Sequence, residues 1–203
     1  MGYLIACLVG YLLGCSNMAL YLSKWKKIDF RSKGSGNLGA SNAAVLMGWR
    51  AGILVGIHDF AKAILAVVLL RSLFPSLEHI GAVAGVCCVL GHIFPFYLKF
   101  KGGKGFASYL GMTIALNWKL ALVVMALVVL VTWITDYIVS GTMTSVLTVP
   151  VYLGIAQRSM ILAAILLVAT IVIFLKHREN FCRIRNGTEI GLRSTIRGNN
   201  RVI

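Results

Sequence analysis

Long apolar runs, separated by short polar segments, make up most of the 203-residue chain. The runs are continuous and lack the alternation of an amphipathic strand. The longer ones approach the roughly 20 residues that a helix needs to cross about 30 Å of hydrocarbon. A helix also satisfies its own backbone hydrogen bonds inside a bilayer. The pattern therefore predicts an all-α integral membrane protein with about seven transmembrane helices, over residues 2–22, 51–70, 80–98, 106–116, 120–135, 137–156 and 159–175.

The run at residues 106–116 is the shortest, and a helix over it would reach only about 16 Å. Such a segment would be tilted, extended through Trp118, or re-entrant, and five crossings would preserve the same placement of the termini. No soluble linker or internal repeat divides the chain, which predicts a single domain over residues 1–203. The first run lacks a basic n-region and an obvious cleavage site, so we expect a retained helix instead of a signal peptide.

The composition agrees with a membrane protein, because 59% of the residues are hydrophobic and only six are acidic. The net charge of +14 is distributed unevenly. If seven segments cross and the N-terminus is outside, sixteen basic residues face the cytoplasm and three face the other side, which favours an external N-terminus and a cytoplasmic C-terminus. The charge is then mostly topogenic and attracts anionic lipid headgroups, and we expect no nucleic-acid partner. The sixteen are Lys24, Lys26, Lys27, Arg31, Lys33, Arg50, Lys99, Lys101, Lys104 and the seven from Lys176 to Arg201.

The cysteines and histidines do not form a recognisable ligand pattern. The five cysteines include no C-x-x-C pair, and the adjacent Cys87 and Cys88 inside an apolar run are typical of small buried hydrophobic residues. The four histidines show no H-E-x-x-H or comparable spacing. We therefore expect no metal site, no structural disulfide and no cofactor.

A cationic glycine loop, KFKGGKGFAS at residues 99–108, lies between two apolar runs. Glycines let successive backbone N–H groups point into one concavity, and lysines add positive charge. A helix beginning near Phe106 would direct its free N–H groups to the same place. These features suit a phosphate, although the Walker A pattern does not match and a tight turn with topogenic lysines is the alternative.

A polar loop nearer the N-terminus, GSGNLGASN at residues 34–42 and called the first polar loop below, is also rich in glycine. It contains a formal G-x-G-x-x-G pattern, but it follows a membrane helix instead of a strand, which excludes a dinucleotide-binding unit. Its polar residues can order a turn or hydrogen-bond a polar ligand; they are Ser35, Asn37, Ser41 and Asn42. Asn42 is also expected to be the N-cap of a following helix.

A third polar segment, KHRENFCRIRNGTE at residues 176–189, follows the last apolar run. His177 and Asn180 would share one face of a continuing helix. His177 could act as a general base or hold a phosphate, and Asn180 could orient a hydroxyl. An interfacial helix end, held by its cations at the lipid surface, is the alternative. Glu189 among so many cations is expected to be ion-paired or to order its loop.

Two charged residues, Asp59 and Lys62, lie one helical turn apart inside a predicted membrane helix. Such charges are costly in hydrocarbon, so they are expected to form an ion pair with each other, with a contribution to an active site as the alternative. Pro95 is expected to kink or end the third helix close to His92.

The three polar segments together resemble the bacterial acyl phosphate:glycerol-3-phosphate acyltransferases, the PlsY family. GSGNLGASN is similar to the first motif of this family, GHIFPFYLKFKGGKGFAS to the second and HRENFCRIRNGTE to the third, and HDFAK resembles its intramembrane Asp and Lys. The resemblance covers residues 34–189. It implies a seven-helix membrane enzyme that transfers a fatty acyl group from acyl phosphate to the 1-hydroxyl of glycerol 3-phosphate, which yields lysophosphatidic acid and phosphate.

The resemblance also implies roles for individual residues. An acyl phosphate is a mixed anhydride, so direct transfer without a covalent enzyme intermediate should suffice, with positioning, charge stabilisation and removal of one proton. The implied residues are Ser35, His177 and Asn180 in catalysis, Gly36 and Asn37 in positioning, Gly102, Gly103, Lys104 and Gly105 in phosphate binding, and Glu189 in structure.

The chain departs from the family at Val45, where the family pattern has an arginine ten residues after the motif serine. Arg50 is the nearest arginine and is the candidate replacement in substrate binding. Either Arg50 or another cation supplies the charge, or the substrate or rate has changed.

Two other functions fit the same segments. A transporter or lipid-phosphate binding protein could use cationic loops without chemistry, although such sites usually lie near the bilayer midplane. A divergent acyltransferase could use another donor or acceptor. The favoured interpretation is a monomeric enzyme of the bacterial plasma membrane, with its active site on the cytoplasmic face, where it meets glycerol 3-phosphate, fatty acyl phosphate and membrane lipids.

Overall fold

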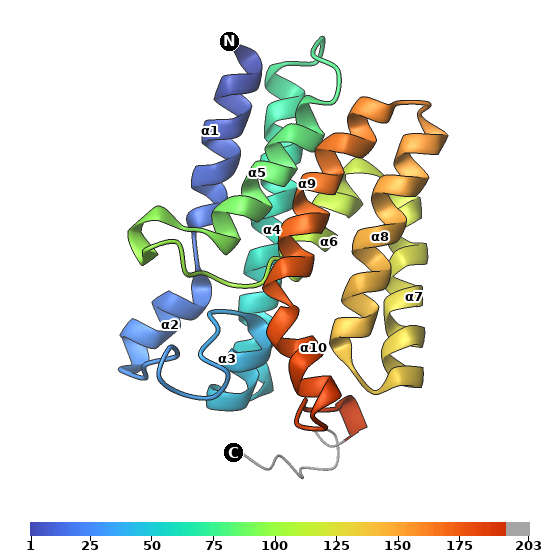
Figure 1. Ribbon diagram of the computed structural model, residues 1–203. Helices are drawn as coiled ribbons and strands as arrows, with labels where there is room; N and C mark the ends of the chain where they lie inside the picture. The colour runs from blue at the N-terminus through green and yellow to red at the C-terminus, as the bar shows by residue number, and fades with distance from the viewer. Residues whose placement is uncertain (194–203) are drawn as a thin grey trace. The chain divides into compact units, whose positions relative to one another are not determined.

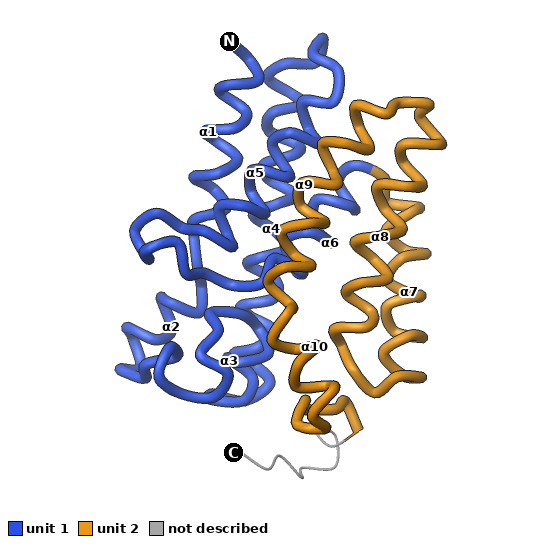
Figure 2. The backbone as a smooth tube through the Cα atoms, in the orientation of Figure 1, with its two compact units in different colours: residues 1–116 blue, residues 117–203 orange. Residues whose placement is uncertain are grey.

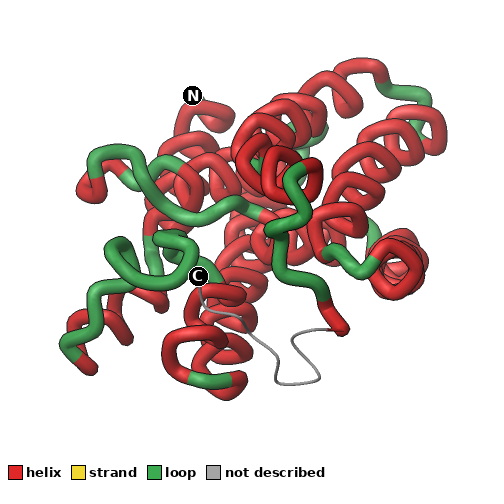
Figure 3. The backbone as a smooth tube through the Cα atoms, turned by 60° about the horizontal axis from the view of Figure 1, so that its bottom comes forward, coloured by secondary structure: helices red, strands yellow, loops and turns green. Residues whose placement is uncertain are grey.

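The computed structural model describes residues 1–193, which form helices joined by loops and contain no strand (Figures 1 and 3). The predicted all-helical class is therefore confirmed. The chain divides into two compact units, residues 1–116 and residues 117–203 (Figure 2). The single domain over residues 1–203 stays a prediction, and the basic residues Arg197 and Arg201 lie outside the described residues.

The first unit carries the first two polar loops between its helices. Its elements are α1 (Gly2–Cys15), α2 (Met18–Lys26), α3 (Ala40–Met47), α4 (Trp49–Leu73), α5 (Ile80–Ile93), the 3-10 turn η1 (Phe96–Leu98) and α6 (Phe106–Leu116). The second unit carries the third polar segment, and its helices are α7 (Trp118–Thr135), α8 (Ile138–Ala156), α9 (Met160–Lys176) and α10 (Arg178–Arg185).

Five helical segments of the described chain are long and apolar enough to cross a membrane. Helices α9 and α10, which meet at a bend of 43°, would make a sixth if they form one span. Helix α6 has 11 residues and is too short to count, as its sequence indicated. Seven crossings and the placement of the termini stay predictions. The five segments are Gly2–Lys26, Trp49–Leu73, Ile80–Leu98, Trp118–Thr135 and Ile138–Ala156.

The first predicted helix is broken, since α1 ends and α2 begins on either side of Ser16 and Asn17. A break inside a bilayer leaves carbonyl groups that need donors. The hydroxyl of Tyr97 donates to the carbonyl of Cys15 (2.5 Å), and Lys62 Nζ donates to the carbonyl of Ser16 (2.7 Å). The Asn17 side chain caps α2 by accepting a backbone N–H from its first turn. The predicted first segment is thus present as one candidate span, Gly2–Lys26, with an interruption that polar groups of α4 and η1 stabilise.

Small residues bring the helices of the first unit close together. Helix α1 packs along α5, and α4 contacts α3, α5 and α6. A side chain at Gly14 would overlap the backbone of Cys88, and one at Gly91 would overlap the backbone of Tyr11. Close approach through small residues is the usual way in which membrane helices associate. It places the end of α5, against which the glycine loop packs, next to the break between α1 and α2.

In the second unit, α8 contacts both α7 and α9. The Thr170 hydroxyl donates to the carbonyl of Val146 (2.7 Å), which joins α9 to α8 inside the unit. Downstream of α10, the backbone N–H of Leu192 donates to the carbonyl of Asp136 (2.7 Å) at the end of α7. The bond between Leu192 and Asp136 holds the segment after α10 against the turn between α7 and α8.

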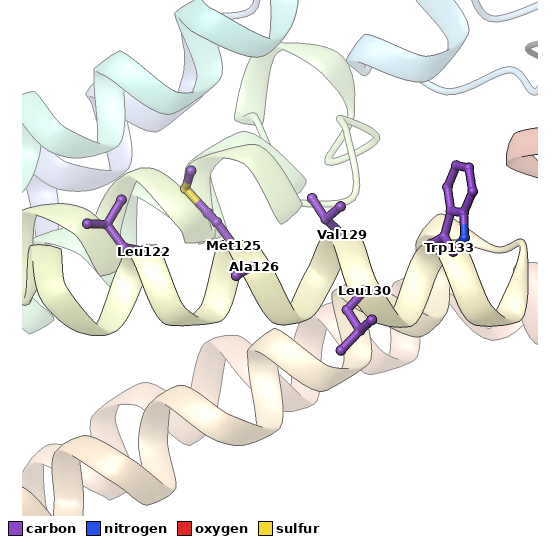
Figure 4. Close-up of a pocket in the computed structure, with 6 residues that line it drawn as sticks. All are labelled: Leu122, Met125, Ala126, Val129, Leu130 and Trp133. Atoms are coloured by element: carbon purple, nitrogen blue, oxygen red, sulfur yellow. The ribbon is translucent and has the colours of Figure 1, made fainter.

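A shallow apolar groove follows helix α7 (Figure 4). Leu122, Met125, Val129 and Trp133 project from the same side of the helix, as their spacing requires. The groove contains no charged side chain, so it does not suit a phosphate. Its lining residues are Leu122, Met125, Ala126, Val129, Leu130 and Trp133.

Candidate active site

Asn42 organises the first polar loop. It lies in the first turn of α3 and is buried, with 2% of its surface exposed. Its Oδ1 accepts the backbone N–H of Ser35 (2.9 Å), and its Nδ2 donates to the carbonyls of Phe30 (3.0 Å) and Asn37 (2.9 Å). The expected N-cap role is wrong, because Gly39 occupies the N-cap of α3. One buried amide instead holds three points of the loop.

Ser35 is presented to the outside of this loop. Gly34 and Gly36 flank it with φ of +60° and +67°, a region that favours glycine. A side chain at Gly34 would also overlap Oδ1 of Asn42. Ser35 itself is exposed, so its hydroxyl is accessible from solvent. The start of the loop is ordered by Asp29, whose pKa is lowered by the backbone N–H of Arg31 at 2.9 Å.

The glycine loop folds back on the C-terminal end of α5. The backbone N–H of Gly102 donates to the carbonyl of Ile93 (3.0 Å), and that of Gly103 donates to the carbonyl of His92 (3.1 Å). These bonds satisfy carbonyls that a helix end leaves free. A side chain at Gly102 would overlap the His92 carbonyl, and one at Gly103 would overlap the His92 ring. Both glycines therefore allow the loop to pack closely against the end of α5.

This geometry limits which loop groups can hold an anion. The amides of Gly102 and Gly103 donate to α5. The charge of the half-buried Lys104 and the N-terminal end of α6 are the features of this loop that suit a phosphate. Gly105, with φ of +91°, turns the chain into α6. Helix α5 ends at Ile93, two residues before Pro95, so the expected termination of this helix near His92 is confirmed.

Arg31 joins the first polar loop to the glycine loop. Its Nη2 donates to the carbonyls of Leu98 and Lys101, both at 3.3 Å. From the sequence, Arg31 is predicted only to be one of the topogenic cations. No spacing in the sequence distinguishes it from Lys33, because the role depends on a contact between segments 67 and 70 positions apart.

The third polar segment lies in the second unit, where His177 ends α9 and precedes α10. The His177 side chain is buried, and its Nδ1–H donates to the carbonyl of Ile173 (2.8 Å). In the neutral ring, Nε2 then carries the lone pair and can accept a proton. The expected continuous helix through His177 and Asn180 is bent at this histidine, by 43° between α9 and α10.

Glu189 holds the loop that follows α10. Its Oε1 accepts Nδ2 of Asn180 (2.5 Å), and its Oε2 accepts Nε of Arg183 (2.6 Å). The expected ion pair and loop-ordering role of Glu189 is confirmed. Because Glu189 accepts from its Nδ2, the Asn180 amide has a defined orientation.

The position that departs from the family pattern, Val45, is 40% exposed on α3. Arg50 lies at the start of α4, with its guanidinium 5.5 Å from the centre of the Trp49 ring. A cation over an indole ring is stabilised without an acid partner. Both residues belong to the unit that holds the two joined loops.

Asp59 and Lys62 form the expected ion pair, with Lys62 Nζ 2.8 Å from Asp59 Oδ1, and both residues are buried. Lys62 reaches further, to the carbonyl of Ser16 and to Nδ1 of His92. The structure thus places the intramembrane ion pair beside the start of the glycine loop, which the sequence had shown only as two separate features.

Comparison with known proteins places these loops in a family. Residues 4–187 match the model of the glycerol-3-phosphate acyltransferase family. A glycerol-3-phosphate acyltransferase of Coxiella burnetii (strain CbuG_Q212) is 39% identical over 93% of this chain and 97% of its own length. One of Geobacter sulfurreducens is 33% identical over 92% of this chain and 95% of its own.

Comparison with solved structures supports the same family. A crystal structure of PlsY, an integral membrane glycerol 3-phosphate acyltransferase, in its glycerol 3-phosphate form has a TM-score of 0.88 and 28% identity, over 96% of this chain and 98% of that one. Its lysphosphatidic acid form has a TM-score of 0.83 and 29% identity, over 94% and 95%. With nearly its whole length matched in sequence and in fold, and with all three polar segments present, the chain belongs to the glycerol-3-phosphate acyltransferase family.

Proposed function

We propose that this protein transfers a fatty acyl group from an acyl phosphate to the 1-hydroxyl of glycerol 3-phosphate, which forms lysophosphatidic acid and inorganic phosphate. The supporting observation is the pair of polar loops joined by Arg31, one presenting Ser35 and the other Lys104. Both substrates carry phosphate and one carries a lipid tail. A cationic loop pair on an apolar helical protein suits both.

The chemistry needs no covalent enzyme intermediate. The 1-hydroxyl oxygen attacks the acyl carbon of the mixed anhydride, the bond from that carbon to the phosphate oxygen breaks, and phosphate leaves with the bonding electrons. The hydroxyl proton goes to Nε2 of His177 or to a phosphate oxygen of a substrate. Ser35 serves as a hydrogen-bonding residue and Asn180 orients the hydroxyl, so catalysis rests on positioning and on stabilisation of the leaving phosphate.

We assign phosphate binding to the glycine loop at residues 99–108. Lys104 supplies charge, and Gly105 lets the chain turn so that the first amides of α6 point at the anion. Gly102 and Gly103 contribute by letting the loop rest on α5. Gly36 and Asn37 position the acceptor side, and Arg50 is the candidate replacement for the arginine absent at position 45.

The same proposal includes the placement of the protein. Seven crossings, with the N-terminus outside and the C-terminus in the cytoplasm, would put all three polar segments on the cytoplasmic side of the plasma membrane, where glycerol 3-phosphate is available. The excess of basic residues on that side supports this arrangement. We propose that the enzyme acts as a monomer.

The test is a reconstitution. Purified protein in lipid nanodiscs is incubated with radiolabelled glycerol 3-phosphate and either palmitoyl phosphate or a palmitoyl thioester. Formation of lysophosphatidic acid with the acyl phosphate alone is expected. Product from the thioester alone would assign a different donor, which the valine at position 45 makes worth testing. Uptake of glycerol 3-phosphate into proteoliposomes without any product would assign transport in place of transfer.

A further inference from the structure

The intramembrane ion pair is part of a larger buried cluster in the first unit. Lys62 Nζ donates to the carbonyl of Ser16 (2.7 Å), to Oδ1 of Asp59 (2.8 Å) and to Nδ1 of His92 (2.9 Å). An ammonium group has three N–H donors and no acceptor, so these three partners saturate it. The three contacts join the break after α1, helix α4 and the end of α5.

Nδ1 of His92 faces two charged groups of α4. Lys62 Nζ, a donor, lies 2.9 Å from it and pairs with the lone pair of a ring protonated at Nε2. Asp59 Oδ1 also lies 3.2 Å from Nδ1, on the same edge of the ring. The edge that carries Nδ1 is thus held by two charged groups of α4, and the ring is buried.

The opposite edge of the His92 ring lies against the glycine loop. The three heavy atoms nearest to a Cβ added at Gly103 are all atoms of this ring, with Nε2 first. The backbone N–H of Gly103 also donates to the carbonyl of His92 (3.1 Å). His92 therefore contacts the loop through its ring and through its backbone, and the position of the ring decides how closely Gly103 can approach α5.

If Asp59 and Lys62 only neutralised each other, their contacts could stay within one turn of α4. Buried charges are costly in hydrocarbon, and those that persist normally serve a specific arrangement. Here two of the three Lys62 donors leave α4 for other elements, and one ends at the residue that supports the glycine loop.

We propose that Asp59 and Lys62 are positioning residues: they hold the His92 ring, and the ring fixes the position of the loop at residues 101–105 and with it that of Lys104. The inference rests on the proposed role of this loop in phosphate binding. Neither charged residue needs to touch substrate.

The first test replaces Lys62 by methionine, which has a similar length and no charge. The amides of Gly102 and Gly103 should then exchange hydrogen for deuterium at least about tenfold faster, because their acceptors on α5 are no longer held. The KM for glycerol 3-phosphate should rise by about tenfold, with a smaller change in kcat. His58→Gln is the matched control, since His58 lies in the same cluster, 3.0 Å from Ser16 Oγ, whereas the three atoms nearest to a Cβ at Gly103 all belong to His92.

The second test is a double-mutant cycle on His92 and Gly103. Gly103→Ala should raise KM because its methyl group meets the His92 ring. In a His92→Ala background the same change should add less than about a twofold effect, because the obstructing ring is gone. Additive losses would show that the ring does not set the loop position and would overturn the proposal.

The readouts separate this proposal from the proposed function. Faster exchange in Lys62→Met with an unchanged KM would support the positioning role and remove the loop from phosphate binding. Unchanged exchange would overturn the positioning role, whatever the activity. If Lys62→Met elutes as an aggregate, the cycle on His92 and Gly103 decides, since both of its single variants retain the ion pair of Asp59 and Lys62.

Discussion

At the residue scale, Asn42 shows how much one buried amide can organise. Asn42→Ala removes the acceptor for the Ser35 amide and the donors to Phe30 and Asn37, and each such bond is worth about 1 kcal/mol. The loop should lose its single conformation, so kcat/KM for acyl transfer should fall by about tenfold or more. Ser41→Ala is the matched control on the neighbouring, exposed position. Equal activity in both variants would contradict the assigned role.

His177 allows a second residue-scale prediction. The Nδ1–H of His177 donates to the Ile173 carbonyl, so Nε2 carries the lone pair of the neutral ring. If His177 is the base, His177→Ala should lower kcat by about 10²–10⁴ with little change in KM. Single-turnover kinetics would measure the chemical step directly. A loss of only a few-fold would shift the proton to a phosphate oxygen of the substrate.

Val45 allows a third prediction at the residue scale. If Arg50 replaces the family arginine, Arg50→Ala should nearly abolish transfer and Val45→Arg should add little. If nothing replaces it, the wild type should be weakly active, and Val45→Arg should raise kcat/KM by about tenfold, the gain from one charge-assisted hydrogen bond. Full activity of both wild type and Arg50→Ala, without a gain from Val45→Arg, would make this position dispensable.

At the scale of elements, the contact between the two polar loops depends on Arg31. Arg31→Ala removes both of its hydrogen bonds to the glycine-loop segment, so the KM for glycerol 3-phosphate should rise by about three- to tenfold. Lys33→Ala removes the same charge from the same exposed loop and is the matched control. A similar rise in both variants would mean that only the local positive charge matters.

The helical elements themselves were mostly foreseeable. All seven apolar runs are helical, and the sequence showed correctly that residues 106–116 are too short and that α5 ends near Pro95. The break at Ser16 and Asn17 was not foreseeable, because neither residue is a strong helix breaker within an apolar run. It exists where Tyr97 and Lys62, distant in sequence, satisfy the freed carbonyls.

At the scale of the whole molecule, the charge distribution predicts a topology that labelling can check. In a cysteine-free background, cysteines at the exposed positions 33, 101 and 185 should react with a membrane-impermeant maleimide only after the cells are permeabilised, whereas one at position 158 should react in intact cells. Reaction of any of the first three in intact cells would contradict a single cytoplasmic site.

The sequence alone determined the membrane character, the helical class, the family and the segments that carry chemistry, because these depend on runs of like residues and on motifs contiguous in the chain. Only the tertiary structure decided that Asn42 holds the first loop, that Arg31 joins it to the second, and that the Gly102 and Gly103 amides are bonded to α5. It also decided that Lys62 reaches a carbonyl 46 residues away. The physical reason is that a buried donor takes whichever acceptor the packed helices bring within about 3 Å, and sequence spacing does not encode that distance.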